Sequence, residues 1–89
     1  METQATTHKF EIEVSYNGVS RELAVEPHEQ VTAVLQRAIQ LFGITQQPHL
    51  LSLFFEDGNV VNENTSAEAA GLKDDVKVYL RQNVAKGGS

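Results

Sequence analysis

The residues of this chain whose types and spacing best suit chemistry are Ala85-Lys86-Gly87-Gly88-Ser89. The first interpretation is a reactive end: the carboxyl group of Gly88 becomes available for chemistry once Ser89 is removed. The second is that Gly-Gly-Ser is a flexible linker sequence that carries no chemistry. The five residues alone do not separate these interpretations, so the domain that carries them has to be considered.

The other reactive residue types form no recognisable catalytic or metal-binding pattern. The chain has no cysteine, which excludes disulfides, thiolate metal sites and cysteine nucleophiles. Three histidines, His8, His28 and His49, fall on separate elements without ligand spacing and are predicted to be surface residues. The glycine pair does not precede a helix, so it is no phosphate-binding loop. We therefore predict no metal site, no cofactor and no intrinsic catalysis.

The composition is that of one small globular domain. The chain has 89 residues, of which 40% are hydrophobic and 21% charged, too apolar a mixture for a disordered protein. No apolar run reaches membrane-spanning length, and residues 1–7 lack the features of a signal peptide. The net charge of -5 argues against nucleic acid, whose binding needs a basic face. We expect a cytoplasmic carrier or interaction module with neither a nucleic-acid nor a membrane partner.

Alternating residues predict a pair of strands at the start of the domain. Over residues 10–16 apolar and polar side chains alternate, the period-two pattern of a half-buried strand. Asn17-Gly18 follows, and this dipeptide is a strong hairpin signal because both turn positions need positive φ. Residues 19–25 are expected to form the second strand. The sequence thus predicts an antiparallel hairpin, preceded by a flexible tail over residues 1–8.

Apolar residues at three- and four-residue spacing after Pro27 predict a helix. Glu29 is expected in its first turn, where the helix dipole favours a carboxylate, and Gly43 is expected to follow its end as the C′ residue. The apolar face must lie across the sheet, because two layers are the minimum that buries both. The residues expected on that face are Val31, Val34, Leu35, Ala38, Leu41 and Phe42.

Further strands are expected in the second half of the chain. Residues 50–55 are dense in bulky apolar side chains, and residues 59–61 are a candidate short strand. Alternation over residues 76–81 predicts the last strand. Between them, Thr65 or Ser66 is expected to cap a short helical turn.

The order of these elements predicts an α+β fold. It is a ββαββ order, with a mixed sheet of four to five strands and one helix packed across it. The last strand is expected at the centre of the sheet, parallel to the first and reached by a crossover. The domain should span residues 9–82. Residues 83–89 are polar and glycine-rich, which predicts an extended, flexible tail.

These elements resemble the ubiquitin-like β-grasp family. The Val-Glu-Pro of residues 25–27 and the next four residues are similar to ubiquitin's junction between strand and helix. The span from Val31 through Gly43-Ile44 matches its helix and helix exit without a gap. Residues 76–81 are similar to its last strand, and a Gly-Gly tail follows. The resemblance covers residues 9–88.

The departures from ubiquitin indicate a divergent member. Five residues separate Arg81 from Gly87, a longer tail than ubiquitin's and one without its Leu-Arg. The segment over residues 62–75 is shorter, and the helix contains no lysine, so chains linked through equivalent lysines are not expected. These departures favour a bacterial ubiquitin-like modifier over ubiquitin itself.

The resemblance implies a protein modifier that is joined to its targets through Gly88, beside Gly87, after proteolytic removal of Ser89 and ATP-dependent activation. Arg81 matches the arginine that activating enzymes recognise, and Lys86 is expected to share that role. The plainer interpretation of Arg81 is an exposed arginine at a strand end. The implied partners are ubiquitin-activating-like and conjugating-like enzymes, a processing protease or isopeptidase, and target proteins. The chain itself would be a substrate and not an enzyme.

Phe54 and Tyr79 are the second candidate site. In the expected register both point away from the helix, onto the sheet face that ubiquitin uses to bind partners, with Ser52 and Lys77 beside them. Aromatic side chains are enriched at interfaces because they bury a large area at little entropic cost. This face predicts partner binding or self-association, and a non-conjugated adaptor is the alternative function. A register error of one residue would exchange the two faces. A sulfur carrier is a third possibility, and Ser89 counts against it.

Overall fold

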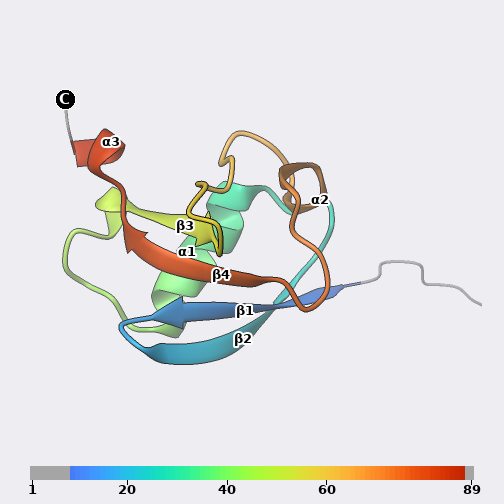
Figure 1. Ribbon diagram of the computed structural model, residues 1–89, viewed down its shortest axis with the longest axis horizontal. Coiled ribbons are helices and arrows are strands. Elements are labelled where there is room, and N and C mark those ends of the chain that lie inside the picture. The colour runs from blue at the N-terminus through green and yellow to red at the C-terminus, as the bar shows by residue number, and fades with distance from the viewer. Residues whose placement is uncertain (1–8, 88–89) are drawn as a thin grey trace, which may run out of the picture.

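The computed structural model describes residues 9–87; the predicted tail over residues 1–8, and Gly88 and Ser89, lie outside the described part (Figure 1). A four-stranded sheet in the order β2-β1-β4-β3 carries one long helix, α1, across one face (Figure 1). The elements are β1 (Phe10–Tyr16), β2 (Val19–Val25), α1 (Val31–Leu41), η1 (Pro48–Leu50), β3 (Leu51–Phe55), α2 (Ala67–Ala70), β4 (Lys77–Gln82) and α3 (Val84–Gly87). The predicted α+β fold is confirmed.

The predicted hairpin is present. Strands β1 and β2 pair antiparallel, and Asn17 and Gly18 form the turn between them with φ values of 51° and 81°. Positive φ at both positions is what a two-residue turn of this kind requires, because it matches the twist of the flanking strands.

Strand β4 takes the central position that was expected. It pairs parallel to β1, with Val14 opposite Val78, and antiparallel to β3, with Leu53 opposite Leu80. The expected short strand over residues 59–61 is reduced to a single bridge between Phe54 and Val60. The turn that follows β3 leaves room for only a brief pairing there.

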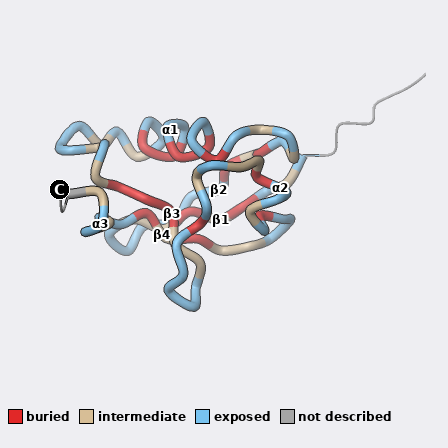
Figure 2. Tube along the Cα trace, turned by 90° about the horizontal axis from the view of Figure 1, so that it is seen from above, coloured by how far each residue is buried: buried red, intermediate tan, exposed pale blue. Residues whose placement is uncertain are grey.

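The core lies between the sheet and α1, and Figure 2 shows the buried face of α1 turned toward the strands. The sheet supplies alternate residues of each strand, as the period-two pattern predicted. The buried hydrophobic residues are Ile12, Val14, Leu23, Val25, Val31, Val34, Leu35, Ala38, Ile39, Leu51, Leu53, Val61, Ala67, Leu72, Val78 and Leu80.

The apolar face of α1 differs from the expected one at two residues. Leu41 is 37% exposed, whereas Ile39, which was not expected on this face, is 5% exposed. At about 100° per residue the two side chains lie on opposite borders of the apolar stripe, and the fold covers the Ile39 border. The predicted stop at Gly43 is confirmed: Gly43 has a φ of 64°, and its N–H and that of Ile44 donate to the carbonyls of Gln40 and Ile39.

Glu29 does not lie in the first turn of α1, as was predicted, because the helix begins after Gln30. Its carboxylate instead accepts hydrogen bonds from Nη1 of Arg37 at 2.8 and 2.7 Å. Nη2 of Arg37 donates to the carbonyl of Ala24 at 2.7 Å, which ties the helix to the end of β2. The predicted cap of α2 is Ser66, whose hydroxyl accepts from the N–H of Ala69 at 3.3 Å.

Candidate functional site

Phe54 and Tyr79 lie side by side on the sheet face opposite α1. They are register partners in the antiparallel pairing of β3 and β4, and their neighbours in each strand, Leu53 and Leu80, point into the core. Both aromatic side chains are half-buried. The expected register is therefore correct. We call Phe54 and Tyr79 the aromatic patch.

Arg81 lies over the aromatic patch. Its Cζ atom is 4.9 Å from the ring centroid of Tyr79 and 5.9 Å from that of Phe54. At these distances the guanidinium is attracted to the faces of both rings. Among the residues that the structure describes, no carboxylate forms an ion pair with Arg81. Arg81 and the two rings thus form one continuous surface.

Lys77 lies at the other end of the aromatic patch. Its Nζ atom is 5.6 Å from the centroid of Tyr79 and 3.8 Å from Oε2 of Glu13 on the neighbouring strand. The side chain is partly exposed, as expected for a residue beside a binding surface. The ion pair with Glu13 is partly solvated and contributes little to stability.

Val60 belongs to the same surface and was missed by the sequence analysis. It bridges to Phe54 across the turn after β3 and is 46% exposed. The signal was present in the two adjacent valines, because one of two consecutive residues in an extended segment must point away from the core. Val61 takes the inward position, at 1% exposed.

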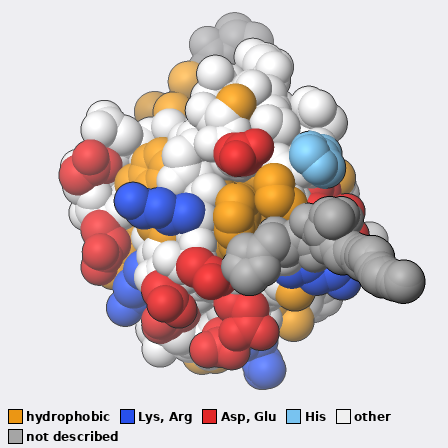
Figure 3. All heavy atoms as spheres, turned by 90° about the vertical axis from the view of Figure 1, so that its right-hand side faces the viewer, with side chains coloured by type: hydrophobic (Ala, Val, Ile, Leu, Met, Phe, Trp, Pro, Cys, Tyr) orange, Lys and Arg blue, Asp and Glu red, His pale blue; other side chains and the backbone are white. Residues whose placement is uncertain are grey.

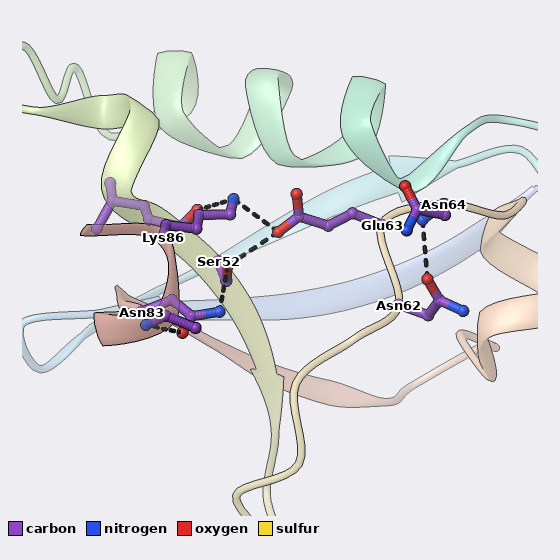
Figure 4. Close-up of polar contacts among 8 residues, drawn as sticks. Ser52, Asn62, Glu63, Asn64, Asn83 and Lys86 are labelled. Atoms are coloured by element: carbon purple, nitrogen blue, oxygen red, sulfur yellow. Dashed lines mark hydrogen bonds and ion pairs between the residues drawn. The ribbon is translucent and has the colours of Figure 1, made fainter. Parts of the chain in front are cut away.

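Ser52 was predicted to flank the aromatic patch as a binding residue, and this prediction is wrong. It points to the expected face but is fully buried. Its hydroxyl donates to Oε2 of Glu63 at 2.8 Å and accepts from Nδ2 of Asn83 at 3.1 Å (Figure 4). Both groups come from outside the sheet and cover it, so Ser52 is not available to a partner.

The segment after β4 is folded back and not extended, which corrects the predicted conformation of residues 83–87. Residues 84–87 form a helical turn, α3. The N–H of Asn83 donates to the carbonyl of Leu50 at 2.8 Å, and its Oδ1 accepts from the N–H of Ala85 at 3.0 Å. Asn83 therefore both anchors the segment beside β3 and caps the turn.

Lys86 completes a polar network at this place. Its Nζ atom lies 2.7 Å from Oε2 of Glu63 and donates to the carbonyl of Leu51 at 2.6 Å (Figure 4). We call Ser52, Glu63, Asn83 and Lys86 the tail cluster. It holds the residues just before Gly87 against the sheet, so the ammonium group of Lys86 is engaged within the chain.

Acidic side chains gather on the end of the molecule that carries α2 (Figure 3). Within residues 9–87, no group of three or more histidine, cysteine, aspartate or glutamate side chains is arranged to hold a metal ion. His28 and His49 are exposed, as predicted, and His8 lies outside the described residues. No helix in the described part of the chain is long and apolar enough to cross a membrane.

No protein-family model and no curated protein matches the sequence. Solved structures do match the fold. Caldiarchaeum subterraneum ubiquitin has a TM-score of 0.71 at 22% identity, over 85% of this chain and 95% of that one. The ubiquitin-like domain of an Arabidopsis thaliana protein has a TM-score of 0.73 at 11% identity, over 92% of this chain and 85% of that one. This chain has the ubiquitin-like β-grasp fold.

A third structure with this ubiquitin-like fold is ATBAG1, solved in complex with HSP70. It has a TM-score of 0.72 at 16% identity, over 89% of this chain. The chain spans only 43% of the length of that protein. At these identities the likeness establishes the ubiquitin-like fold, and the bacterial origin stays a prediction.

The ubiquitin-like fold brings together some of the predicted site residues and separates others. Arg81 lies with the aromatic patch, whereas Lys86, predicted to share its role in enzyme recognition, lies in the tail cluster. Gly87 ends α3, and Gly88 and Ser89 lie outside the described residues. The roles of these residues in conjugation stay predictions.

Proposed function

We propose that this ubiquitin-like chain is a protein modifier that is joined to its targets through Gly88. The observation that carries the proposal is the position of the glycine pair in the fold. Strand β4, the central and last strand, ends at Gln82, and Gly87-Gly88 follow within a few residues. A reactive carboxyl group at Gly88 would therefore stand on a short arm beside the domain.

The proposed chemistry uses a protease, ATP, an enzyme thiol and a target amine, none of which this chain supplies. A protease hydrolyses the Gly88–Ser89 peptide bond with water, which leaves a carboxylate on Gly88. That carboxylate attacks the α-phosphorus of ATP, and pyrophosphate leaves. An enzyme thiol then attacks the acyl carbon and releases AMP, and a target amine finally displaces the thiol to form an amide. The chain is the substrate at each step, and its partners are the activating-like and conjugating-like enzymes, the protease or isopeptidase and the target proteins.

Glycine suits this role for a steric reason. A chain end that enters a narrow enzyme channel must bring its backbone close to the walls, where a Cβ atom would collide. Gly87 and Gly88 both lack that atom and adopt torsions that other residues avoid. The cytoplasm, predicted from the lack of cysteine, is also where ATP is available.

The proposal is tested by charging the chain with the activating enzyme encoded in its own host. Chain purified from the host is expected to lack Ser89 by intact mass. With ATP and the enzyme it should form a product that migrates as a thioester and is lost on reduction. A chain that keeps Ser89 in the host and is never charged after its removal would contradict the proposal. A mass gain from oxygen-to-sulfur exchange at Gly88 would identify a sulfur carrier instead.

A second candidate function is a non-conjugated adaptor that binds a protein through the aromatic patch. The observation that favours it is the position of Arg81 over both rings, because Tyr and Arg side chains dominate the energetics of many interfaces. ATBAG1, part of which has the same fold, is solved in complex with HSP70. Self-association through the same face is a form of this function.

Phe54→Ala is expected to weaken binding of the partner, or of a second copy, by about tenfold or more, since it removes one of the two rings of the aromatic patch. The dissociation constant is measured by calorimetric titration of the reconstituted complex and, for self-association, by sedimentation equilibrium. Leu41→Ala is the control, because Leu41 is an exposed apolar residue on α1, on the other face of the sheet. Equal effects of the two substitutions would exclude the aromatic patch as the binding surface.

A further inference from the structure

The residues just before the glycine pair are held on the folded domain by the polar contacts of the tail cluster. Each side chain of the tail cluster has a partner within it. The carboxylate of Glu63 accepts a hydrogen bond from Ser52 and forms an ion pair with Lys86 (Figure 4). The side chain of Asn83 forms hydrogen bonds with the hydroxyl of Ser52 and with the N–H of Ala85 in α3. The side chains of Lys86 and Glu63 are only 27% and 21% exposed. The contacts join parts of the chain that are far apart in sequence.

The order of α3 depends on these contacts. A helix of four residues is far too short to persist by itself in water. Its apolar residue, Val84, is 87% exposed, so burial of hydrophobic surface does not hold the turn in place. Polar and charged contacts do so, and such contacts exchange readily with water and weaken in salt. Contacts of this kind allow exchange between a docked and an extended segment without unfolding of the sheet.

We infer that α3 and the tail cluster form a latch that withholds the C-terminal glycines until it is released. A helical rise of about 1.5 Å per residue gives α3 a length of about 6 Å, against about 13 Å for the same four residues extended. In the docked state the backbone of α3 is coiled and Lys86 is anchored to the carbonyl of Leu51, so residues 83–87 lie against the body of the domain. An enzyme channel accepts only an extended strand.

The latch also gives Lys86 a specific role. In the docked state its ammonium group pairs with Glu63. A carboxylate beside the channel of an activating enzyme would take the place of Glu63 as the partner of the Lys86 ammonium group. The same step would then release the latch and let the enzyme recognise Lys86. This inhibitory role rests on the proposed modifier function, whereas the latch itself does not.

The rate of trypsin cleavage after Lys86 measures release of the latch. Trypsin cleaves there only when the Lys86 side chain leaves Glu63 and the backbone extends. Loss of residues 87–89 is followed by intact mass, with the free peptide of residues 82–89 as the unlatched reference. The folded chain should be cleaved more slowly than the peptide. Glu63→Gln should raise the rate about tenfold, since it removes the negative charge that attracts the ammonium group of Lys86. Added salt should speed cleavage of the unsubstituted chain relative to the peptide.

Glu56→Gln is the matched control, because Glu56 is an exposed carboxylate at the turn after β3 and lies outside the tail cluster. It should leave the cleavage rate unchanged. Asn83→Ala is a second release variant, since it removes the bonds to Ser52 and Ala85 without changing charge. Cleavage after Arg81, within β4, reports unfolding and separates it from release. The latch is refuted if the unsubstituted chain is cleaved as fast as the peptide. It is also refuted if both release variants are cleaved only as fast as the unsubstituted chain.

The inhibitory role has its own readout. Single-turnover charging of Glu63→Gln, made without Ser89, should be faster than that of the chain with Glu63. If the two chains are charged at equal rates although Glu63→Gln is cleaved faster by trypsin, the inhibitory role is refuted and the latch is still supported. No charging of either form would refute the modifier function, and the trypsin result would still decide the latch.

Discussion

Ile12→Ala is expected to lower the free energy of unfolding by about 2 to 5 kcal/mol, the cost of emptying a fully buried aliphatic site. Ile12 is 0% exposed on β1, a strand enclosed between β2 and β4, so neighbouring side chains cannot easily collapse into the space. A domain of this size has a total stability of about 5 to 15 kcal/mol. We therefore expect the melting temperature to fall by more than about 10 °C.

The measurement is urea and thermal unfolding followed by circular dichroism. Val19→Ala is the matched control, because it also replaces a β-branched residue in a strand of the hairpin but at a site that is 48% exposed. Its effect should stay within about 0.5 to 1 kcal/mol. Similar losses for the two variants would mean that Ile12 is not packed as the structure describes.

Gly88→Ala is expected to reduce thioester formation by at least about a hundredfold, because a methyl group at the reacting residue displaces the carboxyl carbon within its channel. The variant is made as a chain that stops at residue 88, so that a failure of the protease is not mistaken for a failure of activation. Single-turnover charging with the host's activating enzyme and ATP is the measurement.

Ser20→Ala, at an exposed residue of β2, two strands away from β4, serves as the control and should be charged at the unsubstituted rate. If both variants keep the melting temperature of the unsubstituted chain, the loss of thioester formation is due to the change at the carboxyl group and not to unfolding. If Gly88→Ala is charged normally, the glycine is not needed there, and the adaptor function becomes the better proposal.

Elements with local signals were predicted correctly. Asn17-Gly18 specifies its turn through the φ values of two residues, and Gly43 ends α1 through its own positive φ. The alternation of residues 76–81 identified β4, and the rules of strand connection placed it at the centre. In each case the residues that determine the element lie within it or beside it. Such determinants can be recognised without knowing the rest of the structure.

Features set by distant contacts were not predicted. The burial of Ser52 depends on Glu63, 11 residues away, and on Asn83, 31 residues away. The folded segment after β4 depends on the contact of Lys86 with Leu51, across 35 residues. The polar, glycine-rich composition of residues 83–89 predicts an extended tail, and tertiary contacts override this prediction over residues 83–87. The sheet face of Phe54 and Tyr79 was therefore predicted correctly, whereas the exposure of Ser52 was not.

The parallel pairing of β1 with β4 has a consequence for synthesis of the protein on the ribosome. The hairpin of β1 and β2 emerges first, but its inner edge has no partner until residues 77–82 have left the exit tunnel. A nascent chain thus carries an unpaired strand edge and an exposed apolar face through most of its translation. We expect the domain to fold only after β4 has emerged, with its nascent hairpin a substrate for ribosome-bound chaperones.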